Sequence, residues 1–507
     1  MKLVGIKLRD FRAFPGEFAL ELKDGCNLLL HGENGSGKSS LAIALREFFS
    51  LERPFPRPID SEENVFANPP QPMVSLTFSS ASGNEEIVWE TGHYHPLEVG
   101  SDPEKANPAT QQQRETLMAV SRCSGFFDYR ALLRASLLQT VDSLPEQLFL
   151  LFVENLLAGF RAKLRGGERY LGELWSELKK TMPKSRRYPH IQRANGVARQ
   201  FDDAFRPFLA QVTEKANEYL PYFPENRMKI GFDYPGSSFA KSTKLLTGKS
   251  VNPVIEFNGK KVDGHHQFLN EARLTALALS VFLAAVKLAD GNPDNPDPLR
   301  LLVLDDVLIG LDLNNRLPLL ELLRREFPRH QIVLLTHDLV WFEIAKEHTT
   351  DWGIWCYARL FEEPLGPVDP MFPRAQRVKP DVDDLTVAQG YLGAGDLRAA
   401  AVYVRAAYES CLRNVCQKRN ISLPFKKNPR DVKAEDLWQA IVSVHDSRVA
   451  SGSPGFVNPT LIPKVNAIRS AVLNRLSHSG ASSLTSTELS TALQTIREMR
   501  LPTAFVP

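Results

Sequence analysis

Short runs of alternating apolar and polar residues recur along the first half of the chain. This alternation is typical of β-strands, in which successive side chains point to opposite faces of a sheet. The pattern predicts strands at residues 2–8, 17–23, 74–78, 86–90, 228–232 and 254–257. Unbroken apolar runs at 27–30, 301–304 and 331–335 predict further strands that are buried on both faces.

Helical periodicity replaces this pattern in the middle and at the end of the chain. From about residue 146 to 225, apolar residues recur every three or four positions. Pro183 and Pro189 interrupt this segment, so it cannot be one long coiled coil. A helical hairpin with arms of roughly 30 residues would reach about 45 Å, at 1.5 Å per residue. Residues 274–288 predict a long apolar helix, and 382–507 predict a separate helical domain.

Composition narrows the class of protein. At 507 residues the chain is long enough for two or three domains, and its 43% hydrophobic and 24% charged residues are ordinary for a globular protein. The net charge of +2 gives no overall field that would attract nucleic acid, so any nucleic-acid site must be a local basic patch. Five cysteines without a C-x-x-C spacing favour a reducing compartment and argue against a zinc site. Without a signal peptide or an apolar run of membrane-spanning length, we expect a cytoplasmic protein that does not contact a membrane.

A glycine-rich segment joins the apolar run 27–30 to a helical pattern that ends near Phe48. It matches G-x-x-x-x-G-K-S, in which backbone N–H groups and the amino end of a helix bind phosphate. Lys38 would reach the β- and γ-phosphates, and Ser39 would hold Mg²⁺. The segment therefore predicts an ATP site with Mg²⁺, formed by Gly32, Asn34, Gly35, Ser36, Gly37, Lys38, Ser39 and Ser40.

Two strands further along the chain end in side chains that suit this chemistry. Asp305 closes the apolar run 301–304 and could hold the Mg²⁺ shell, while Asp306 would polarise the attacking water. His337 follows the next strand and could contact the γ-phosphate. A histidine at a strand end is often only structural, but the ordered set is difficult to obtain by chance. We predict Asp305, Asp306 and His337 as catalytic residues, with Ser39 and Asp305 as metal ligands.

The set of motifs resembles the ABC-type ATPase heads of the SMC and RecF class. The family's signature segment corresponds to Asn270, Glu271 and Ala272, ahead of a helix, and Arg12 lies in the stretch resembling its first strand and turn. Residues 310–312 resemble the loop that crosses between two heads. About 265 residues separate Lys38 from the acidic strand, as expected when a helical segment interrupts a head.

This resemblance implies an α/β P-loop ABC-type ATPase head with an inserted helical hairpin or bundle, followed by an all-α domain. It also implies that the signature of one chain completes the ATP site of another, giving a homodimer or a higher homo-oligomer. Prolines at 364, 367, 370, 373 and 380 suggest an extended linker. The predicted plan is a head at 1–145 and 226–360, an insertion at 146–225, a linker at 361–381 and a helical domain at 382–507.

Two departures from the family pattern predict slow hydrolysis. Aspartate stands at 306 where the family has glutamate, and Ala272 replaces a signature glycine. Both changes affect the transition state more than ground-state binding. Gln139 is a weak candidate for the family's Q-loop glutamine and is also consistent with a helix surface.

The segments FLNEARLTALALS and LVLDDVL also resemble a narrower group, the compact ATPases of bacterial anti-phage systems such as Septu and, more distantly, PARIS. Those proteins act with a separate nuclease or toxin subunit. The resemblance therefore implies an ATPase subunit of a defence complex. A RecF-like ATPase of DNA repair or recombination is the alternative, and the genomic neighbours would separate the two.

The carboxy-terminal helices resemble HEPN domains, some of which are ribonucleases with an R-x(4–6)-H motif. Arg475 lies too near to His478 for this motif, and Arg469 lies too far from it. A structural four-helix module, with Asn474 and His478 hydrogen-bonded inside it, is therefore favoured over an ATP-gated ribonuclease.

Basic residues gather where the two prolines break the insertion: Lys179, Lys180, Lys184, Arg186, Arg187 and Arg193. Charge runs are usually solvated faces. At the expected tip of a hairpin, this cluster is also a candidate for salt-sensitive contact with DNA or another nucleic acid.

Overall fold

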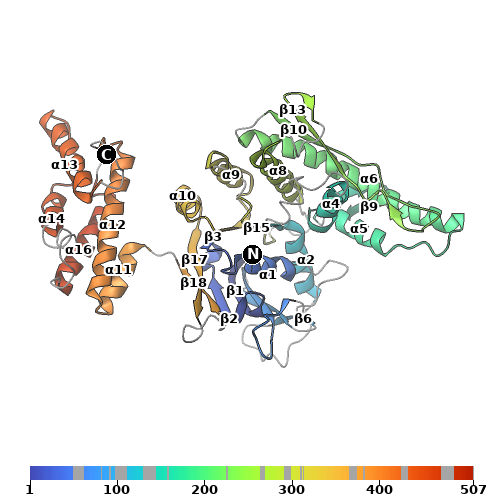
Figure 1. Ribbon diagram of the computed structural model, residues 1–507, viewed down its shortest axis with the longest axis horizontal. Helices are drawn as coiled ribbons and strands as arrows, with labels where there is room; N and C mark the ends of the chain where they lie inside the picture. The colour runs from blue at the N-terminus through green and yellow to red at the C-terminus, as the bar shows by residue number, and fades with distance from the viewer. Residues whose placement is uncertain are drawn as a thin grey trace. The chain divides into compact units, whose positions relative to one another are not determined.

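The structure is a computed structural model that describes residues 1–49, 62–80, 83–90, 93–97, 111–128, 144–156, 159–223, 227–262, 269–289, 298–308, 311, 313–364, 374–380, 383–423, 432–469 and 485–505. The chain forms two compact units, Met1–Pro380 and Asp381–Pro507 (Figure 1). Each unit has its own hydrophobic core, and each is described by itself.

A six-stranded sheet is the centre of the first unit. Its strands stand in the order β18 (Arg374–Pro380), β17 (Trp355–Pro364), β3 (Asn27–Gly32), β16 (Gln331–Thr336), β15 (Leu301–Asp305) and β7 (Gly125–Asp128). All neighbours are parallel except β18, which is antiparallel to β17. The carboxyl ends of β3, β16, β15 and β7 therefore lie along one edge, where ligands bind in sheets of this kind.

A second sheet is antiparallel and lies on one side of the first. Its order is β2 (Phe14–Glu21), β1 (Lys2–Phe11), β4 (Met73–Ser80), β5 (Gly83–Glu90) and β6 (His93–Leu97). It shares a core with helix α1 (Lys38–Phe48), which buries Leu41, Leu45 and Phe48. The strands predicted from alternation at 2–8, 17–23, 74–78 and 86–90 are confirmed, and so is the mixed α/β character of this unit.

Helices cover the opposite face of the central sheet (Figure 1): α8 (Glu271–Ala289), α9 (Leu313–Glu326) and α10 (Leu339–Thr349). Alternate residues of β3 divide between the faces, since Leu29 joins the core under these helices and Leu28 and Leu30 join the core around α1. By length and hydropathy α8 could cross a membrane, contrary to our expectation for the sequence, but 78% of its apolar window is buried in the protein. The helix is apolar on all sides because other elements surround it.

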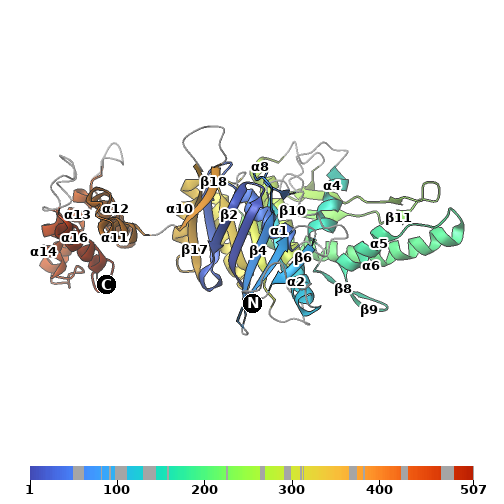
Figure 2. The same cartoon turned by 90° about the horizontal axis from the view of Figure 1, so that it is seen from below.

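The inserted segment is built on α6 (Tyr188–Tyr219), which is antiparallel to the shorter α5 (Leu171–Lys180) (Figures 1 and 2). Ahead of them come α2 (Gln111–Cys123), α4 (Leu144–Leu151) and a π-helical turn at Phe152–Leu156. The predicted helical pattern was wrong at 161–170, where β8 (Arg161–Leu164) and β9 (Gly167–Tyr170) form a hairpin. Gly167, with a φ of 119°, closes the turn between these strands.

Short strands that follow α6 in the chain run back along it. They are β10 (Met228–Asp233), β11 (Ser238–Phe239), β12 (Leu246–Thr247), β13 (Asn252–Phe257) and β14 (Lys260–Lys261). Aromatic side chains fill the core between α4, α5, α6 and these strands; Phe205, for example, contacts Phe149, Phe201 and Tyr234.

The predicted linker at 361–381 was wrong for most of its length. Residues up to Pro364 belong to β17, and Arg374–Pro380 form β18 at the edge of the central sheet, paired from Ala358↔Pro380 to Pro364↔Arg374. Prolines fit here because an edge strand and strand ends can dispense with ladder N–H groups. The prolines at 367, 370 and 373 lie outside the described residues.

The second unit contains α11 (Asp384–Gly393), α12 (Leu397–Lys418), α13 (Ala434–Ala450), α14 (Leu461–Ile468) and α16 (Ser486–Met499). These helices bury Tyr408 and Trp438, and Trp438 Nε1 donates a hydrogen bond to Asn466 Oδ1 at 3.0 Å. Arg469 pairs with Glu435. Asn474, Arg475 and His478 lie outside the described residues.

Two cysteines that are 330 positions apart in the sequence form a disulfide between Cys26 and Cys356. It joins the residue before β3 to the second residue of β17, neighbouring strands of the central sheet. Cys123, Cys411 and Cys416 are free and buried. Cysteine spacing gave no sign of this pair, because only the parallel pairing of β3 with β17 brings the two positions together.

Candidate functional site

The loop between β3 and α1 has a backbone that depends on glycine. Gly35 and Gly37 have φ angles of 91° and 101°, a region in which side chains are strained. A β-carbon on Gly37 would lie 3.1 Å from Gln376 and 3.2 Å from Phe14, and one on Gly32 would lie 2.9 Å from a carbonyl oxygen of β17. The loop is therefore curled tightly between β17, β18 and the β1–β2 turn.

The amino end of α1 presents unsatisfied donors to this loop. Its N-cap is Gly37, so no side chain caps the first-turn N–H groups. The Oγ of Ser36 is buried within the loop without a hydrogen-bond partner. Such a curl of backbone amides at a helix amino terminus is suited to phosphate oxygens. Asn34 lies exposed in the same loop, and Ser40 is half-buried in the first turn of α1.

Lys38 is held inside the loop rather than in solvent. Only 4% of its side chain is exposed, and its Nζ donates hydrogen bonds to the carbonyl oxygens of Gly32 at 2.7 Å and Glu33 at 3.0 Å. The same Nζ lies 3.7 Å from Asp306 Oδ2. The ammonium group thus stands between the curled loop and the acidic strand end, where it would meet the β- and γ-phosphates of a nucleotide.

Asp305 and Ser39 form the part of the site that fits a divalent cation. The Ser39 side chain lies near the Asp305 carboxylate and acts to lower its pKa, and Asp305 Oδ1 is buried without a partner. Burial raises the pKa of Asp305 to about 6, and the negative charges of Asp306 and Asp128 add to this effect. Mg²⁺ in nucleotide sites needs only one or two protein oxygens besides phosphates and water. These two residues are therefore a sufficient set for Mg²⁺.

Asp306 and His337 are directly connected. Asp306 Oδ1 accepts hydrogen bonds from the backbone N–H of His337 and from its ring Nδ1, both at 2.9 Å. Asp306 adopts a φ of 51°, which turns it out of β15 towards the loop. After His337, Asp338 caps α10 by accepting from the Trp341 N–H at 3.0 Å and pairs with Arg316 at 2.6 Å. The predicted acid and histidine therefore lie beside Lys38 with fixed orientations.

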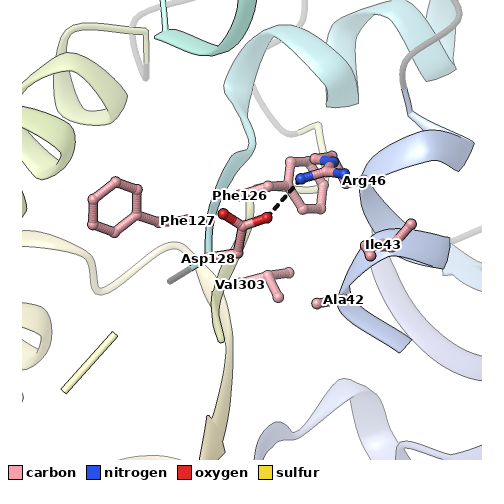
Figure 3. A pocket seen from close by; sticks show the side chains of 7 residues that line it. All are labelled: Ala42, Ile43, Arg46, Phe126, Phe127, Asp128 and Val303. Atoms are coloured by element: carbon pink, nitrogen blue, oxygen red, sulfur yellow. Dashed lines mark hydrogen bonds and ion pairs between the residues drawn. The ribbon is translucent and has the colours of Figure 1, made fainter. Parts of the chain in front are cut away.

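Asp128 is a site residue that our reading of the sequence missed. It ends β7 and is the register partner of Asp305 on the parallel strand β15. Figure 3 shows Arg46 of α1 reaching Asp128, with 2.8 Å between Arg46 Nη1 and Asp128 Oδ2. The small pocket around this pair has about 10 Å³ of space, enough for one water. The sequence pattern that could have identified Asp128 is the short apolar run Gly125–Phe127. It is followed by a carboxylate, just as the apolar run 301–304 is followed by Asp305.

Arg12 was predicted to contact nucleotide, but its guanidinium forms an ion pair with Glu62. The backbone around it is also engaged, since the Arg12 N–H donates to the Glu62 carbonyl and its own carbonyl accepts from Asn64. The β1–β2 turn does contact the phosphate loop, through Ala13 and Phe14 next to Gly37. The structure pairs Arg12 with Glu62, and contact between Arg12 and nucleotide stays a prediction.

The signature segment forms the start of α8. Asn270 is exposed and caps the helix, with its Oδ1 accepting from the Arg273 N–H at 3.0 Å. Glu271 is exposed in the first turn and Ala272 is half-buried. This leaves the helix amino terminus open to solvent. Gly310 and Asp312 of the predicted crossing loop, and Gln139, lie outside the described residues.

The six predicted basic residues surround the turn between α5 and α6. Lys179 and Lys180 end α5, Lys184, Arg186 and Arg187 lie in the connection, and Arg193 is in the second turn of α6. All six are exposed. They lie on the insertion and contribute no contact to the phosphate loop among those that the structure describes.

Comparison with known proteins finds no matching family model and no matching curated protein. Among solved structures, the chain is similar to an SMC head bound to the C-terminal winged-helix domain of ScpA, with 13% identity, 75% of this chain and 97% of that chain covered, and a TM-score of 0.41. An SMC head domain from Thermotoga maritima has 14% identity, covers 75% and 100%, and has a TM-score of 0.35. RecF with ATP, a recombination mediator, has 14% identity, covers 71% and 95%, and has a TM-score of 0.40. Similarities at this level say nothing of activity or partners.

Proposed function

We propose that this chain binds ATP with Mg²⁺ at the loop of residues 32–40 and hydrolyses it slowly. One observation carries the proposal: residues far apart in the sequence meet around the loop. Lys38 lies 3.7 Å from Asp306, and Ser39 lies near enough to Asp305 to act on its pKa. A glycine-dependent loop alone could be an ordinary turn, and two aspartates alone could simply end a strand, so neither feature by itself indicates a nucleotide site. Together they match the needs of a triphosphate and its cation.

Each residue then has a distinct task. The loop amides and Lys38 bind the phosphates, and Ser39 and Asp305 hold the cation, whose charge offsets that of the transferring phosphoryl group. Asp306 orients and polarises the attacking water, and His337 holds the carboxylate in place through two hydrogen bonds. Because aspartate is one methylene shorter than glutamate, water is held less well, and a misplacement near 1 Å costs about 10²-fold in rate.

Asp128 belongs to the same proposal as a positioning residue. Its carboxylate is the register neighbour of Asp305 and raises the pKa of that group. Arg46 offsets part of this negative charge and fixes the Asp128 side chain. The pair thereby sets the electrostatic field in which Asp305 meets the cation.

We also propose that two chains share the nucleotides. The exposed amino end of α8, with Asn270 and Glu271, is free to approach the γ-phosphate of a second head. ATP bound at two such sites would hold a homodimer together, so the association should tighten when ATP is present. The carboxy-terminal helical domain is the proposed site of any higher assembly.

In the cell, we propose a role in anti-phage defence. The resemblance of the signature and acidic-strand segments to the compact ATPases of such systems supports it, together with an insertion whose longest helix has only 32 residues. The partner would be a separate nuclease or toxin subunit. Copurification of the tagged chain expressed with its genomic neighbours tests this. An effector nuclease or toxin in the complex supports defence, whereas recombination proteins support the repair alternative.

The binding proposal is tested by titrating the purified chain with ATP and Mg²⁺ in a calorimeter and by sedimentation of the same samples. Lys38→Ala should lose measurable ATP binding and stay monomeric, because the ammonium contacts the phosphates. Lys163→Ala is the matched control, since that lysine is 88% exposed on β8. Equal ATP affinity for Lys38→Ala and wild type would overturn the assignment of the site. A wild-type chain that binds ATP but stays monomeric at all concentrations would overturn only the dimer.

A further inference from the structure

The far end of the α5–α6 hairpin is basic over a long stretch of sequence. Between Leu178 and Gln200 the chain has no aspartate or glutamate. The same stretch carries seven exposed cationic side chains: Lys179, Lys180, Lys184, Arg186, Arg187, Arg193 and Arg199. The whole protein has a net charge of only +2, so this excess is local.

The structure brings a second basic segment to the same end of α6. Successive hydrogen bonds follow the returning chain towards the tip. Asn217 accepts from Ile230 N–H at 2.9 Å, Asp202 from Ser237 N–H at 3.0 Å, and Asn195 from Phe239 N–H at 2.6 Å. The β11–β12 turn at 240–245 continues in this direction beside α6 (Figure 2).

This second segment has the same one-sided charge. Residues 234–255 contain three lysines and no acidic residue. Lys249 lies 3.7 Å from Glu146, whereas Lys241 and Lys244 lie in the turn at 240–245. We name the distal basic surface by its members: Lys179, Lys180, Lys184, Arg186, Arg187, Arg193, Arg199, Lys241 and Lys244.

Two acidic residues that border this surface are engaged elsewhere, while Asp203 of α6 is exposed. Glu177 pairs with Arg169 at 2.9 Å. Asp202 accepts hydrogen bonds from the Tyr234 hydroxyl at 2.6 Å and from Ser237, so it faces the interior of the insertion. Among the described residues, no ion pair joins any member of the distal basic surface to an acidic side chain. The surface therefore keeps its full charge.

We propose that the distal basic surface binds the phosphate backbone of a nucleic-acid duplex. Along α6 alone, the distance from Tyr188 to Arg199 is about 17 Å. A duplex carries one negative charge per about 1.7 Å of axis, so it offers about ten phosphates over this length. Tyr188, which is 67% exposed, adds a hydroxyl of a kind that often bonds to phosphate. The charges lie on flexible side chains around a turn, which suits sequence-independent contact.

This inference stands apart from the ATP site, and its test needs no nucleotide. The full-length chain is titrated against a fluorescein-labelled 30-base-pair DNA duplex of arbitrary sequence, and anisotropy is read at salt concentrations from 50 to 200 mM. The test variants are the triple Lys184→Glu, Arg186→Glu, Arg187→Glu and the double Lys241→Glu, Lys244→Glu. The matched control is the triple Lys23→Glu, Lys260→Glu, Lys261→Glu, which reverses three exposed lysines of the same unit outside the surface.

We expect salt-sensitive binding by the wild type. The first triple should weaken it at least tenfold and flatten the slope of log affinity against log salt by about 2.7, since each lost phosphate contact contributes about 0.9. The double should weaken binding as well, because the turn at 240–245 belongs to the surface only in the folded chain. The control should bind like the wild type.

Three outcomes would overturn the proposal. The first is affinity that is unchanged in both test variants. The second is a loss in the control equal to that in the first triple, which would make the effect one of total charge. The third is competition by poly-glutamate as strong as that by unlabelled duplex at equal charge, which would assign the surface to an acidic protein. Because every changed residue except the half-buried Lys244 is exposed, the circular dichroism spectra should match; if one test variant does not fold, the other carries the test.

Discussion

The phosphate loop and the distal basic surface both depend on lysine, yet they place it in opposite environments. Lys38 is 4% exposed and is fixed by two carbonyl oxygens and a nearby carboxylate. Lys184 and its neighbours on the insertion are exposed and lack such partners among the described residues. The first environment sets one geometry for one ligand. The second supplies positive charge that can attract phosphate groups in many different positions.

The difference decides what a substitution should do. In the phosphate-loop site, side chains contact one another, as His337 and Lys38 both contact Asp306, so one change disturbs several groups. On the exposed surface, charges act through their sum, and a single change has a small effect. Four experiments test this difference.

The largest effect is expected at Asp306. Asp306→Ala should lower ATP turnover by about 10²- to 10³-fold, the usual cost of removing one group that stabilises a transition state. ATP affinity should stay within a few fold, because Lys38, Ser39 and the loop amides remain. Steady-state hydrolysis together with calorimetry measures both. A matched change on the insertion, Arg187→Ala, should alter neither; a loss of turnover there would break the contrast.

Next comes the pH dependence of stability at Asp305. Because its pKa of about 6 in the folded chain exceeds the ordinary 3.8, this group favours folding below about pH 4 and loses that contribution as pH rises to 6. At 1.36 kcal/mol per pKa unit, the buried carboxylate costs about 3 kcal/mol at pH 8. Asp305→Asn should raise the free energy of unfolding by about that amount at pH 8 and by much less at pH 4.

Urea unfolding without Mg²⁺ or nucleotide measures this difference. Asp203→Asn, at an exposed position on α6, is the control and should show no such pH dependence. An increase in the free energy of unfolding for Asp305→Asn that is equal at both pH values would contradict this. It would mean that burial does not raise the pKa of the carboxylate.

A smaller effect is expected at the Arg46–Asp128 pair. Arg46→Met removes the cation and leaves Asp128 negative beside Asp305. The added repulsion should lower ATP turnover by about tenfold, equivalent to about 1.4 kcal/mol in the activation free energy. The double variant Arg46→Met, Asp128→Asn should recover most of the loss, since the extra charge is gone. Without such recovery, Arg46 would act through its other contacts, such as the ion pair with Glu47 at 3.1 Å.

The smallest effect is expected at the tip. Lys184→Ala should change the free energy of unfolding by less than about 0.5 kcal/mol and leave ATP affinity unchanged, as is usual for exposed positions. Thermal unfolding and calorimetry check this. A destabilisation above 1 kcal/mol would show that Lys184 contributes to packing, and the exposed surface would then not differ from the buried site in this respect.

Local patterns were sufficient for the elements that carry the nucleotide site. Strand, glycine loop and helix at 27–48 are contiguous, and Asp305 and His337 each end an apolar run, so their types and positions could be predicted. Asp128 was not predicted because the strand β7 has only four residues, too few for a periodic pattern to identify it as a strand. Its role depends on its pairing with β15, a long-range fact.

Other features that the sequence did not reveal also depend on pairing between distant residues. Arg12 satisfies its charge with Glu62, which no spacing rule foresees across 50 positions. The proline-rich segment appeared to be a linker because edge strands tolerate proline, and only the pairing of β18 with β17 identifies it as a strand. Likewise, Lys241 and Lys244 join the basic tip only because the returning chain runs along α6.

The packing of α6 along α8 has a mechanical consequence. With 32 residues, α6 is a rod about 48 Å long, and one hydrophobic core joins it to α8, which begins at Glu271. Turning the rod by about 5° about its inner end would swing its outer end by about 4 Å, while atoms near the pivot move by fractions of an ångström. The insertion is thus a lever with a long outer arm and a short inner one. If the insertion turned as one rigid body, α8 would move much less than the tip of α6.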